Sequence, residues 1–180
     1  IYGASQGRLD EDNNPIYTTL SLEYVGDNFA SGCTKLHTCK LSSMVEHIGA
    51  QAFKGCKSLN EFNVPSNSNL TLVYSTKDTP FTECENIIFT GTNYGEHGEM
   101  SYCVKDGACY EVNKDGTLTL IHMGKNTPSS SIPTDKVVYA CAYSMEYRTE
   151  PHVMIPANVV FNGDRIFNNS VGQSVTLNNL

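Results

Sequence analysis

The apolar residues of the chain follow an ordered pattern that is clearest between residues 48 and 65. An Ile-Gly pair opens this stretch, and an Ala-Phe pair, a Gly-Cys pair and a leucine follow it. Phe62 and Val64 then alternate with Asn63, as residues on the two faces of a β-strand do, and Pro65 ends the alternation. The segments between such strands are too short for a full helix, so the pattern predicts one turn of α-helix or 3₁₀-helix and then a short strand.

An earlier copy of this pattern lies closer to the N-terminus. A single shift along the sequence, which we call the repeat shift, superposes Leu22, Val25, Gly26, Gly32, Cys33, Leu36, Cys39 and Leu41 on Val45, Ile48, Gly49, Gly55, Cys56, Leu59, Phe62 and Val64. Only Phe29 is out of step, because it lies one position further from Phe53 than the repeat shift requires. We interpret this offset as one residue missing between the glycine and the aromatic residue of the earlier copy.

Later copies are less regular but keep the same order. A longer shift, with the extra length after Val73, places Phe81, Cys84 and Ile87 on Phe53, Cys56 and Leu59. The pairs Ile132-Pro133 and Ile155-Pro156 repeat the signal of Val64-Pro65, and the repeat shift relates one pair to the other. A final copy keeps the spacing of Val45, Gly49, Ala52 and Phe53 at Val159, Gly163, Ile166 and Phe167.

This pattern resembles the BspA-like leucine-rich repeat, which is found in surface proteins of anaerobic bacteria and some protists. The resemblance covers roughly residues 20–177, and the repeat shift lies inside the range of about 20–29 residues that a leucine-rich repeat spans. It implies a mainly β leucine-rich-repeat solenoid, with a ladder of short parallel strands and helical or 3₁₀ turns. The same fold follows from the residues, because one strand and one turn cannot bury their own apolar side and must stack on a neighbour. In the first half we expect strands near residues 20–22, 39–41, 62–64 and 87–90.

The period is interrupted between residues 91 and 125. Two strand-like runs, Tyr102–Val112 and Thr117–Met123, are joined by a turn that contains Asp115-Gly116, and Asp106-Gly107 forms a second turn signal inside the first run. Asp-Gly between β-rich segments is a hairpin signal, so we expect three antiparallel strands. The resembled family often carries such an island, and Tyr110 also matches its pattern.

Together these signals divide the chain into four segments. We expect an N-terminal lead-in or cap at residues 1–19 and leucine-rich repeats at 20–92. A β-hairpin insertion at 93–125 then separates them from degenerate leucine-rich repeats at 126–180.

Seven cysteines leave at least one unpaired within the chain. Cys33, Cys56 and Cys84 occupy equivalent repeat positions, which favours stacking as small buried apolar groups. Cys103 and Cys109 flank the first turn of the predicted hairpin, where a disulfide is an alternative that only geometry can decide. No C-x-x-C pair occurs in the sequence, which excludes zinc ribbons and thioredoxin-like motifs.

Charge and hydropathy argue against nucleic acid as a partner and against a membrane-spanning helix. The formal net charge of −7 and the isoelectric point near 5.1 argue against nucleic acid, because phosphate binding needs clustered Lys and Arg. The longest apolar run, Val137–Tyr143, is far shorter than the roughly 20 residues of a membrane-spanning helix. Because the chain begins at Ile1, we expect an upstream segment, and a signal peptide or a lipid or wall anchor outside this chain is compatible with that expectation.

The candidate catalytic and metal-ligating residues do not form a recognised motif. No histidine pair has the H-x-x-x-H spacing of metal ligands. Asp10, Asp12 and Asn14 resemble the start of a calcium loop, but the required glycine and glutamate are absent. His37 lies two positions before Cys39, so the two share one face of the predicted strand and resemble a Cys/His pair, but we expect Cys39 to be buried and inert. Glu96, His97 and Glu99 form the most compact titratable cluster, which is typical of a solvated loop. We therefore predict no enzyme, no cofactor and no metal site.

The outward positions of the predicted ladder are the most promising binding surface. Such an array can bind an extended partner through many weak contacts. The predicted binding residues are His37, Thr38, Lys40, Asn60, Glu61, Asn63, Met154 and Thr176.

The resemblance implies a secreted or cell-surface repeat module that binds host or matrix proteins in adhesion. Two alternatives remain open. The tyrosine and asparagine content favours a carbohydrate-binding or nutrient-capture accessory surface protein, and a structural spacer would need no ligand. The sequence does not define the oligomeric state.

Overall fold

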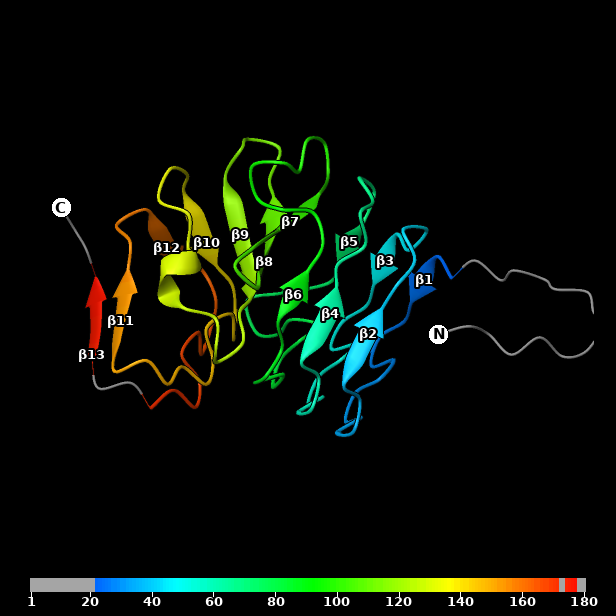
Figure 1. Cartoon of the computed structure of the whole chain (residues 1–180), viewed down its shortest axis with the longest axis horizontal. Helices are drawn as coiled ribbons and strands as arrows, with labels where there is room; N and C mark the ends of the chain where they lie inside the picture. The colour runs from blue at the N-terminus through cyan, green and yellow to red at the C-terminus, as the bar shows by residue number, and fades with distance from the viewer. Residues whose placement is uncertain (1–21, 172–173, 178–180) are drawn as a thin grey trace, which may run out of the picture.

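Short strands stack in parallel along the length of the molecule (Figure 1). The computed structural model describes residues 22–171 and 174–177. The predicted lead-in at 1–19, the calcium alternative at Asp10, Asp12 and Asn14, and residues 20–21 of the first predicted strand lie outside these described residues. The chain is a mainly β solenoid, as the leucine-rich-repeat pattern predicts.

Each coil of the first half contributes one strand to each of two parallel ladders. The first ladder contains β1 (Tyr24–Val25), β3 (His47–Ile48) and β5 (Thr71–Leu72). The second ladder contains β2 (Thr38–Lys40), β4 (Glu61–Asn63) and β6 (Phe89–Thr90). The strands of the second ladder were predicted to within one or two residues. Those of the first ladder were not.

Strand register confirms the repeat shift between the first two copies. Val25 pairs with Ile48 in the first ladder, and Cys39 pairs with Phe62 in the second. Ile48 and Phe62 are fully buried, and both belong to one hydrophobic core. The two ladders therefore face each other across this core, and their outward faces lie on opposite sides of the solenoid.

A hydrogen-bonded turn connects the ladders, in place of the predicted turn of helix. Its backbone has positive φ at two positions four residues apart, such as Gln51 with φ 53° and Gly55 with φ 70°, and such residues interrupt a helix. Equivalent pairs are Asn28 and Gly32, Tyr143 and Tyr147, and Arg165 and Asn169. Successive turns hydrogen-bond to one another, for example from Ala30 N to Ala52 O at 2.7 Å and from Met145 N to Ile166 O at 3.0 Å.

This turn corrects the interpretation of Phe29. Asn28 and Gln51 share positive φ and are related by the repeat shift, so Ala30, and not Phe29, is the equivalent of Phe53. Ala30 is buried, whereas Phe29 is 44% exposed. No residue is missing from the earlier copy; its aromatic residue and alanine stand in the reverse order.

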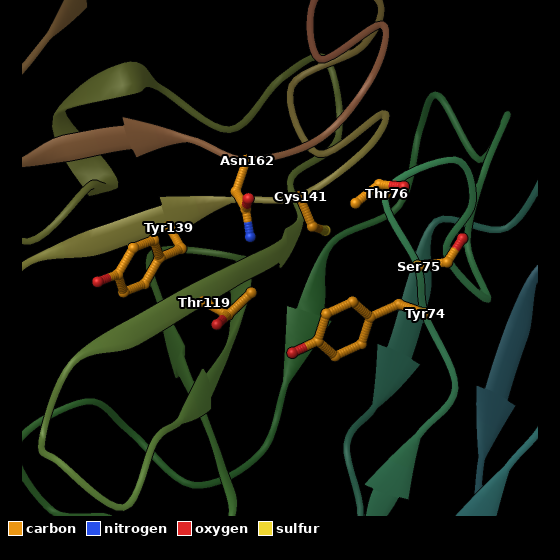
Figure 2. Close-up of a pocket in the computed structure, with 7 residues that line it drawn as sticks. All are labelled: Tyr74, Ser75, Thr76, Thr119, Tyr139, Cys141 and Asn162. Carbon is orange, nitrogen blue, oxygen red and sulfur yellow. The ribbon is translucent and has the colours of Figure 1, made fainter.

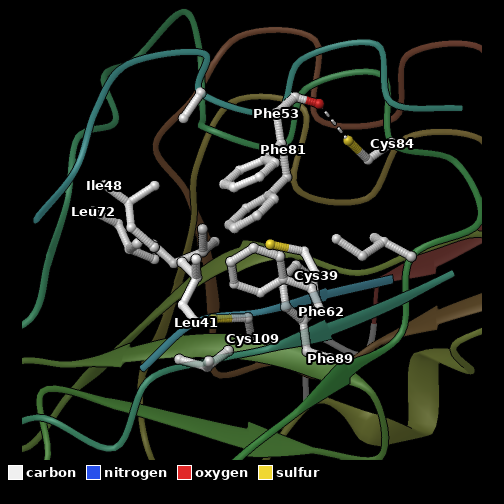
Figure 3. Close-up of a cluster of buried hydrophobic side chains, with 14 of the residues drawn as sticks. Cys39, Leu41, Ile48, Phe53, Phe62, Leu72, Phe81, Cys84, Phe89 and Cys109 are labelled. Atoms are coloured by element: carbon white, nitrogen blue, oxygen red, sulfur yellow. Dashed lines mark hydrogen bonds between the residues drawn. The ribbon is translucent and has the colours of Figure 1, made fainter. Parts of the chain in front are cut away.

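Aromatic side chains fill the core of the first half (Figure 3). The rings of Phe53 and Phe81 stack with their centroids 5.8 Å apart, and Phe62 packs edge-on against both, at 5.1 and 4.8 Å. The contact between Phe53 and Phe81 confirms the longer shift that was predicted between these two copies. The two coils thus add equivalent rings to the same column.

Two of the three equivalent cysteines follow the prediction. Cys56 and Cys84 are fully buried, and the Cys84 thiol donates a hydrogen bond to Phe53 O at 3.0 Å (Figure 3). Burial raises the pKa of the Cys84 thiol well above its ordinary value. Cys33 is exposed, contrary to the prediction, because it lies in the first described coil, which no described coil covers.

Three antiparallel strands follow, as the two Asp-Gly turns predict. They are β7 (Tyr102–Lys105), β8 (Ala108–Val112) and β9 (Leu118–His122). β9 then pairs in parallel with β10 (Val138–Ala140), and β10 pairs with β12 (Val159–Phe161). The last strand of the insertion is therefore also a strand of the solenoid.

The sheet formed by β7, β8 and β9 separates two hydrophobic cores. Val104 and Cys109 pack into the core of the first half, whereas Cys103 and Tyr110 pack into the core of the second. Cys103 pairs with Tyr110 across the strands, and Cys109 pairs with Val104. The two cysteines therefore face opposite sides of the sheet, both are free, and this geometry rules out the disulfide alternative.

The second ladder is divided in the second half of the chain. The 3₁₀-helix η1 (Ser129–Ser131) lies where a strand would join β6 to β11 (His152–Ile155). Met154 N donates to Ser129 Oγ at 3.4 Å, so η1 lies beside β11. Beyond it, β11 pairs only with β13 (Ser174–Leu177) among the described strands.

The final predicted copy is confirmed by its turn and its glycine. Arg165 and Asn169 repeat the positive φ pair of the other turns. A Cβ at Gly163 would overlap the backbone of Ala142, so only glycine allows the two coils to approach this closely. Gly49 makes a similar approach to Asp27 in the first half.

Two titratable side chains, Arg148 and Glu146, are buried in the second half of the chain. Arg148 is 1% exposed; its guanidinium donates to Gly124 O at 2.9 Å and forms an ion pair with Glu150 at 2.8 Å. Glu146 is also buried, and its carboxylate accepts a hydrogen bond from Glu83 N. This part of the core is therefore held by polar contacts, in contrast to the aromatic column.

Candidate binding faces

Six of the eight predicted binding residues lie on β2 and β4 or directly before them, and four of these share one outward face. Thr38 and Lys40 flank buried Cys39, and Glu61 and Asn63 flank buried Phe62. Alternation along a strand therefore directs all four side chains outward. The parallel register places Thr38 beside Glu61 and Lys40 beside Asn63.

His37 and Asn60 lie immediately before the two strands. Both residues are exposed, and Asn60 N donates to His37 O at 2.9 Å. We call the six residues the polar ladder face, which comprises His37, Thr38, Lys40, Asn60, Glu61 and Asn63.

Contacts within the polar ladder face leave its groups available to solvent. Lys40 Nζ lies 3.5 Å from Glu61 Oε1, with the two side chains 69% and 40% exposed. Such exposed ion pairs contribute little to stability, about 0–1 kcal/mol. Asn63 Nδ2 donates to Thr90 Oγ1 at 3.3 Å, which continues the face onto β6. The face thus presents neutral, basic and acidic groups across three successive strands.

Met154 and Thr176 lie apart from the other six predicted residues. They are register partners on β11 and β13 and are both exposed. The helix η1 interrupts the ladder between these strands and β6. The structure therefore does not place Met154 and Thr176 beside the polar ladder face.

A groove of about 300 Å³ runs beside β2. Thr38 and Lys40 contribute to its lining together with the apolar residues Phe29, Leu36 and Phe53. The polar ladder face therefore borders an apolar depression, a combination that suits a partner with both polar and apolar groups.

A second pocket, of about 340 Å³, lies on the opposite outward face and was not predicted (Figure 2). Tyr139 lies between the buried residues Val138 and Ala140 of β10, so its ring points outward. Thr119 is its register partner on β9. The alternation of apolar and aromatic residues at 138–140 is the signal that could have identified this face.

The segment after β5 closes one side of this pocket. Thr76 O accepts a hydrogen bond from Asp164 N at 2.8 Å, which ties the segment to the turn after β12. The Tyr74 hydroxyl donates to the Glu111 carboxylate. Burial, together with this bond to Glu111, raises the pKa of Tyr74 well above its ordinary value. The pocket is therefore held by contacts between coils distant in sequence.

The predicted inertness of Cys39 is consistent with its environment. Its thiol is buried, and burial raises its pKa to about 11, whereas His37 is exposed. Glu96 and Glu99 are exposed on their loop, and His97 Nδ1 accepts a hydrogen bond from Gly95 N at 3.2 Å. No group of three or more His, Cys, Asp or Glu residues within 22–171 and 174–177 could hold a metal ion.

None of the helices in the described part of the chain has the length and apolar character needed to cross a membrane.

Comparison with known proteins agrees with the architecture. Residues 13–92 match the model of the BspA type leucine rich repeat region in six copies. A leucine-rich cell surface protein from Faecalibacterium prausnitzii A2-165 has a similar structure, with a TM-score of 0.68, 23% identity, and coverage of 87% of this chain and 39% of that protein. The pneumococcal vaccine antigen PcpA is similar with a TM-score of 0.56 and 17% identity, covering 87% of this chain and 42% of PcpA. No match was found among curated proteins.

At these identities the two similar structures establish a shared fold. The chain spans about two fifths of the length of each protein.

Proposed function

Because residues 13–92 match the model of the BspA type leucine rich repeat region, we propose that the chain is a secreted or cell-surface module that binds host or matrix proteins in adhesion. The polar ladder face is the proposed contact surface. Met154 and Thr176 are proposed as a separate, smaller contact area on the second part of the ladder.

The observation that carries this proposal is the register of the polar ladder face. Successive coils place Thr38 and Lys40 beside Glu61 and Asn63 on strands that stack in parallel. A partner that runs along the stack can therefore meet one set of side chains per coil. The apolar groove beside β2 would add buried contact area, which supplies most of the binding energy in protein interfaces.

The proposed location has independent support. One of the two similar structures is described as a cell surface protein, which favours an extracellular or surface location for this chain as well. The net charge of −7 favours protein partners with basic patches, because complementary charges accelerate association.

A charge-swap variant provides the direct test. Combining Lys40→Glu with Glu61→Lys reverses the order of the two charges but keeps the ion pair, so stability should be preserved. We expect binding to immobilised extracellular-matrix proteins, measured by biolayer interferometry, to weaken at least ten-fold. Tyr24→Ala, on the exposed outward side of the first ladder, is the matched control and should bind like the wild type.

Two outcomes would contradict the proposal. Equal binding by wild type and charge-swap variant would show that the partner uses another surface. Absence of binding across the whole panel would favour the structural spacer.

A further inference from the structure

We propose that the pocket between Tyr74 and Tyr139 binds a neutral saccharide, with its ring against the two tyrosines and its hydroxyl groups on Asn162 and Thr119. This site lies on the outward face opposite the polar ladder face. It therefore goes beyond the proposed protein-binding function and does not depend on it.

The lining of the pocket favours an uncharged ligand. All seven side chains that line it are uncharged (Figure 2). The thiol of Cys141 remains neutral because burial raises its pKa well above the ordinary value, and it donates to Leu120 O at 3.0 Å. A charged ligand would lose hydration in this pocket without gaining an opposite charge, which is costly.

Two aromatic rings, those of Tyr74 and Tyr139, line the pocket. Figure 2 shows Thr119 between the rings of Tyr74 and Tyr139. A pyranose has faces of C–H groups and edges of hydroxyl groups. Its C–H groups can pack against the electron-rich faces of tyrosine rings, while its edges remain free for hydrogen bonds.

Polar groups for these hydrogen bonds are present at the rim. The Tyr139 hydroxyl and the Asn162 amide are polar groups in this lining. An asparagine amide both donates and accepts, and so does a hydroxyl group, which matches the dual character of sugar hydroxyls. Asn162 is exposed and points into the pocket (Figure 2).

Hydrogen bonds hold the side chains and walls of the pocket in place. Glu111 fixes the Tyr74 hydroxyl, and Asn113 Nδ2 donates to Thr119 Oγ1 at 3.2 Å. The bond from Asp164 N to Thr76 O holds the pocket wall. Groups held in place in this way lose little conformational freedom on binding. The volume of about 340 Å³ lies at the small end of ligand pockets, which span about 300–1,000 Å³, and suits one or two sugar rings.

The test is an array of immobilised neutral and acidic glycans, followed by calorimetric titration with the strongest neutral oligosaccharide. We expect at least one neutral glycan to bind the wild-type protein. Tyr139→Ala and Asn162→Ala should each weaken binding at least ten-fold, and Tyr139→Phe should cause a smaller loss because it keeps the ring. Tyr24→Ala and the Lys40→Glu, Glu61→Lys swap should bind like the wild type, which separates this site from the polar ladder face.

Thermal unfolding of each variant provides the folding control. If Tyr139→Ala is unstable, Asn162→Ala still tests the site, because Asn162 is exposed and its replacement should leave the fold intact. Four results would overturn the proposal: no glycan bound, acidic glycans bound alone, glycan binding unchanged in Asn162→Ala and Tyr139→Phe, or binding of aromatic peptides and not glycans at this pocket.

Discussion

The two halves of the solenoid have the same backbone turn but different side chains in their cores. In the first half, equivalent phenylalanines such as Phe53 and Phe81 stack from coil to coil. In the second half, Met145 takes the turn position of Phe53, and Arg148, Glu146 and His122 are buried nearby. The backbone turn is nevertheless the same in both halves.

This difference shows that the turn recurs more widely than the aromatic column, although the coil of Phe81 keeps positive φ only at Glu83. Positive φ at two positions four residues apart recurs with glycine in some coils and with Tyr147 or Asn169 in others. Hydrogen bonds between successive turns also recur in both halves. Side chains in the core can therefore vary once this backbone frame is kept.

We expect the largest loss of stability when a charged residue replaces one of the stacked phenylalanines of the first half. Phe53 is fully buried between Phe62 and Phe81. Phe53→Asp should unfold the protein, because it removes a buried ring and also buries an unpaired polar group, which together approach the roughly 5–15 kcal/mol that stabilises a domain. Urea unfolding followed by circular dichroism measures the effect. Phe29→Asp, at a 44% exposed position, is the control, and equal losses would contradict the assigned register.

In the second half, we expect the largest loss of stability when the buried guanidinium of Arg148 is removed. Arg148→Ala removes the donor to Gly124 O, Thr127 O and Glu150 Oε2. We expect a loss of about 3–5 kcal/mol in the free energy of unfolding, as for other broken buried ion pairs. A matched surface variant, Lys125→Ala, removes a half-exposed pair with Glu85 and should cost less than about 1 kcal/mol. If both variants were equally stable, the buried network would be dispensable.

Buried Glu146 predicts a pH effect of intermediate size. Burial raises its pKa from 4.5 to about 8 in the folded protein, so the folded state holds this proton more tightly than the unfolded state. Stability from this group is therefore complete below pH 4.5 and is lost as the pH rises to about 8. Between pH 6.5 and 8 the expected loss is about 2 kcal/mol.

Glu146→Gln should remove this decline in urea unfolding measured across the same pH range. His122 acts in the opposite direction, because burial lowers its pKa to about 4, and its contribution is lost as the pH falls from 6.5 to 4. A wild-type stability that rises between pH 6.5 and 8 would refute the assigned burial of Glu146.

The smallest effect is expected on the polar ladder face. Lys40→Ala removes an ion pair that is largely exposed to solvent, so the free energy of unfolding should change by less than about 1 kcal/mol. Thermal unfolding is a sufficient measurement. A larger loss would mean that this face supports the fold and is less available for a partner.

Much of the fold could be predicted from the sequence where short-range patterns decide it. The alternation around Phe62 predicted the second ladder, and the Asp-Gly turns predicted β7, β8 and β9. The first ladder was missed because strands of two residues, such as Tyr24–Val25, show no alternation to read. Phe29 was misplaced because the match was made by residue type, whereas backbone φ sets the register.

The candidate sites were predicted less completely because they depend on distant segments. Outward alternation correctly grouped Lys40 with Asn63. It also grouped Met154 with them, since nothing in the sequence indicates that η1 would interrupt the ladder. The pocket near Tyr139 also depends on the hydrogen bond between Asp164 and Thr76, which lie far apart in the sequence. Charged residues such as Arg148 are usually exposed, so their burial could not be read from the sequence.

The sheet of β7, β8 and β9 is a wall shared by both interiors, because Val104 and Cys109 face one core and Cys103 and Tyr110 face the other. A fragment that ends at either boundary of the insertion, near residue 92 or residue 125, would expose the apolar residues on one side of this sheet to water. The two halves should therefore melt together in a single transition, despite the different chemistry of their interiors.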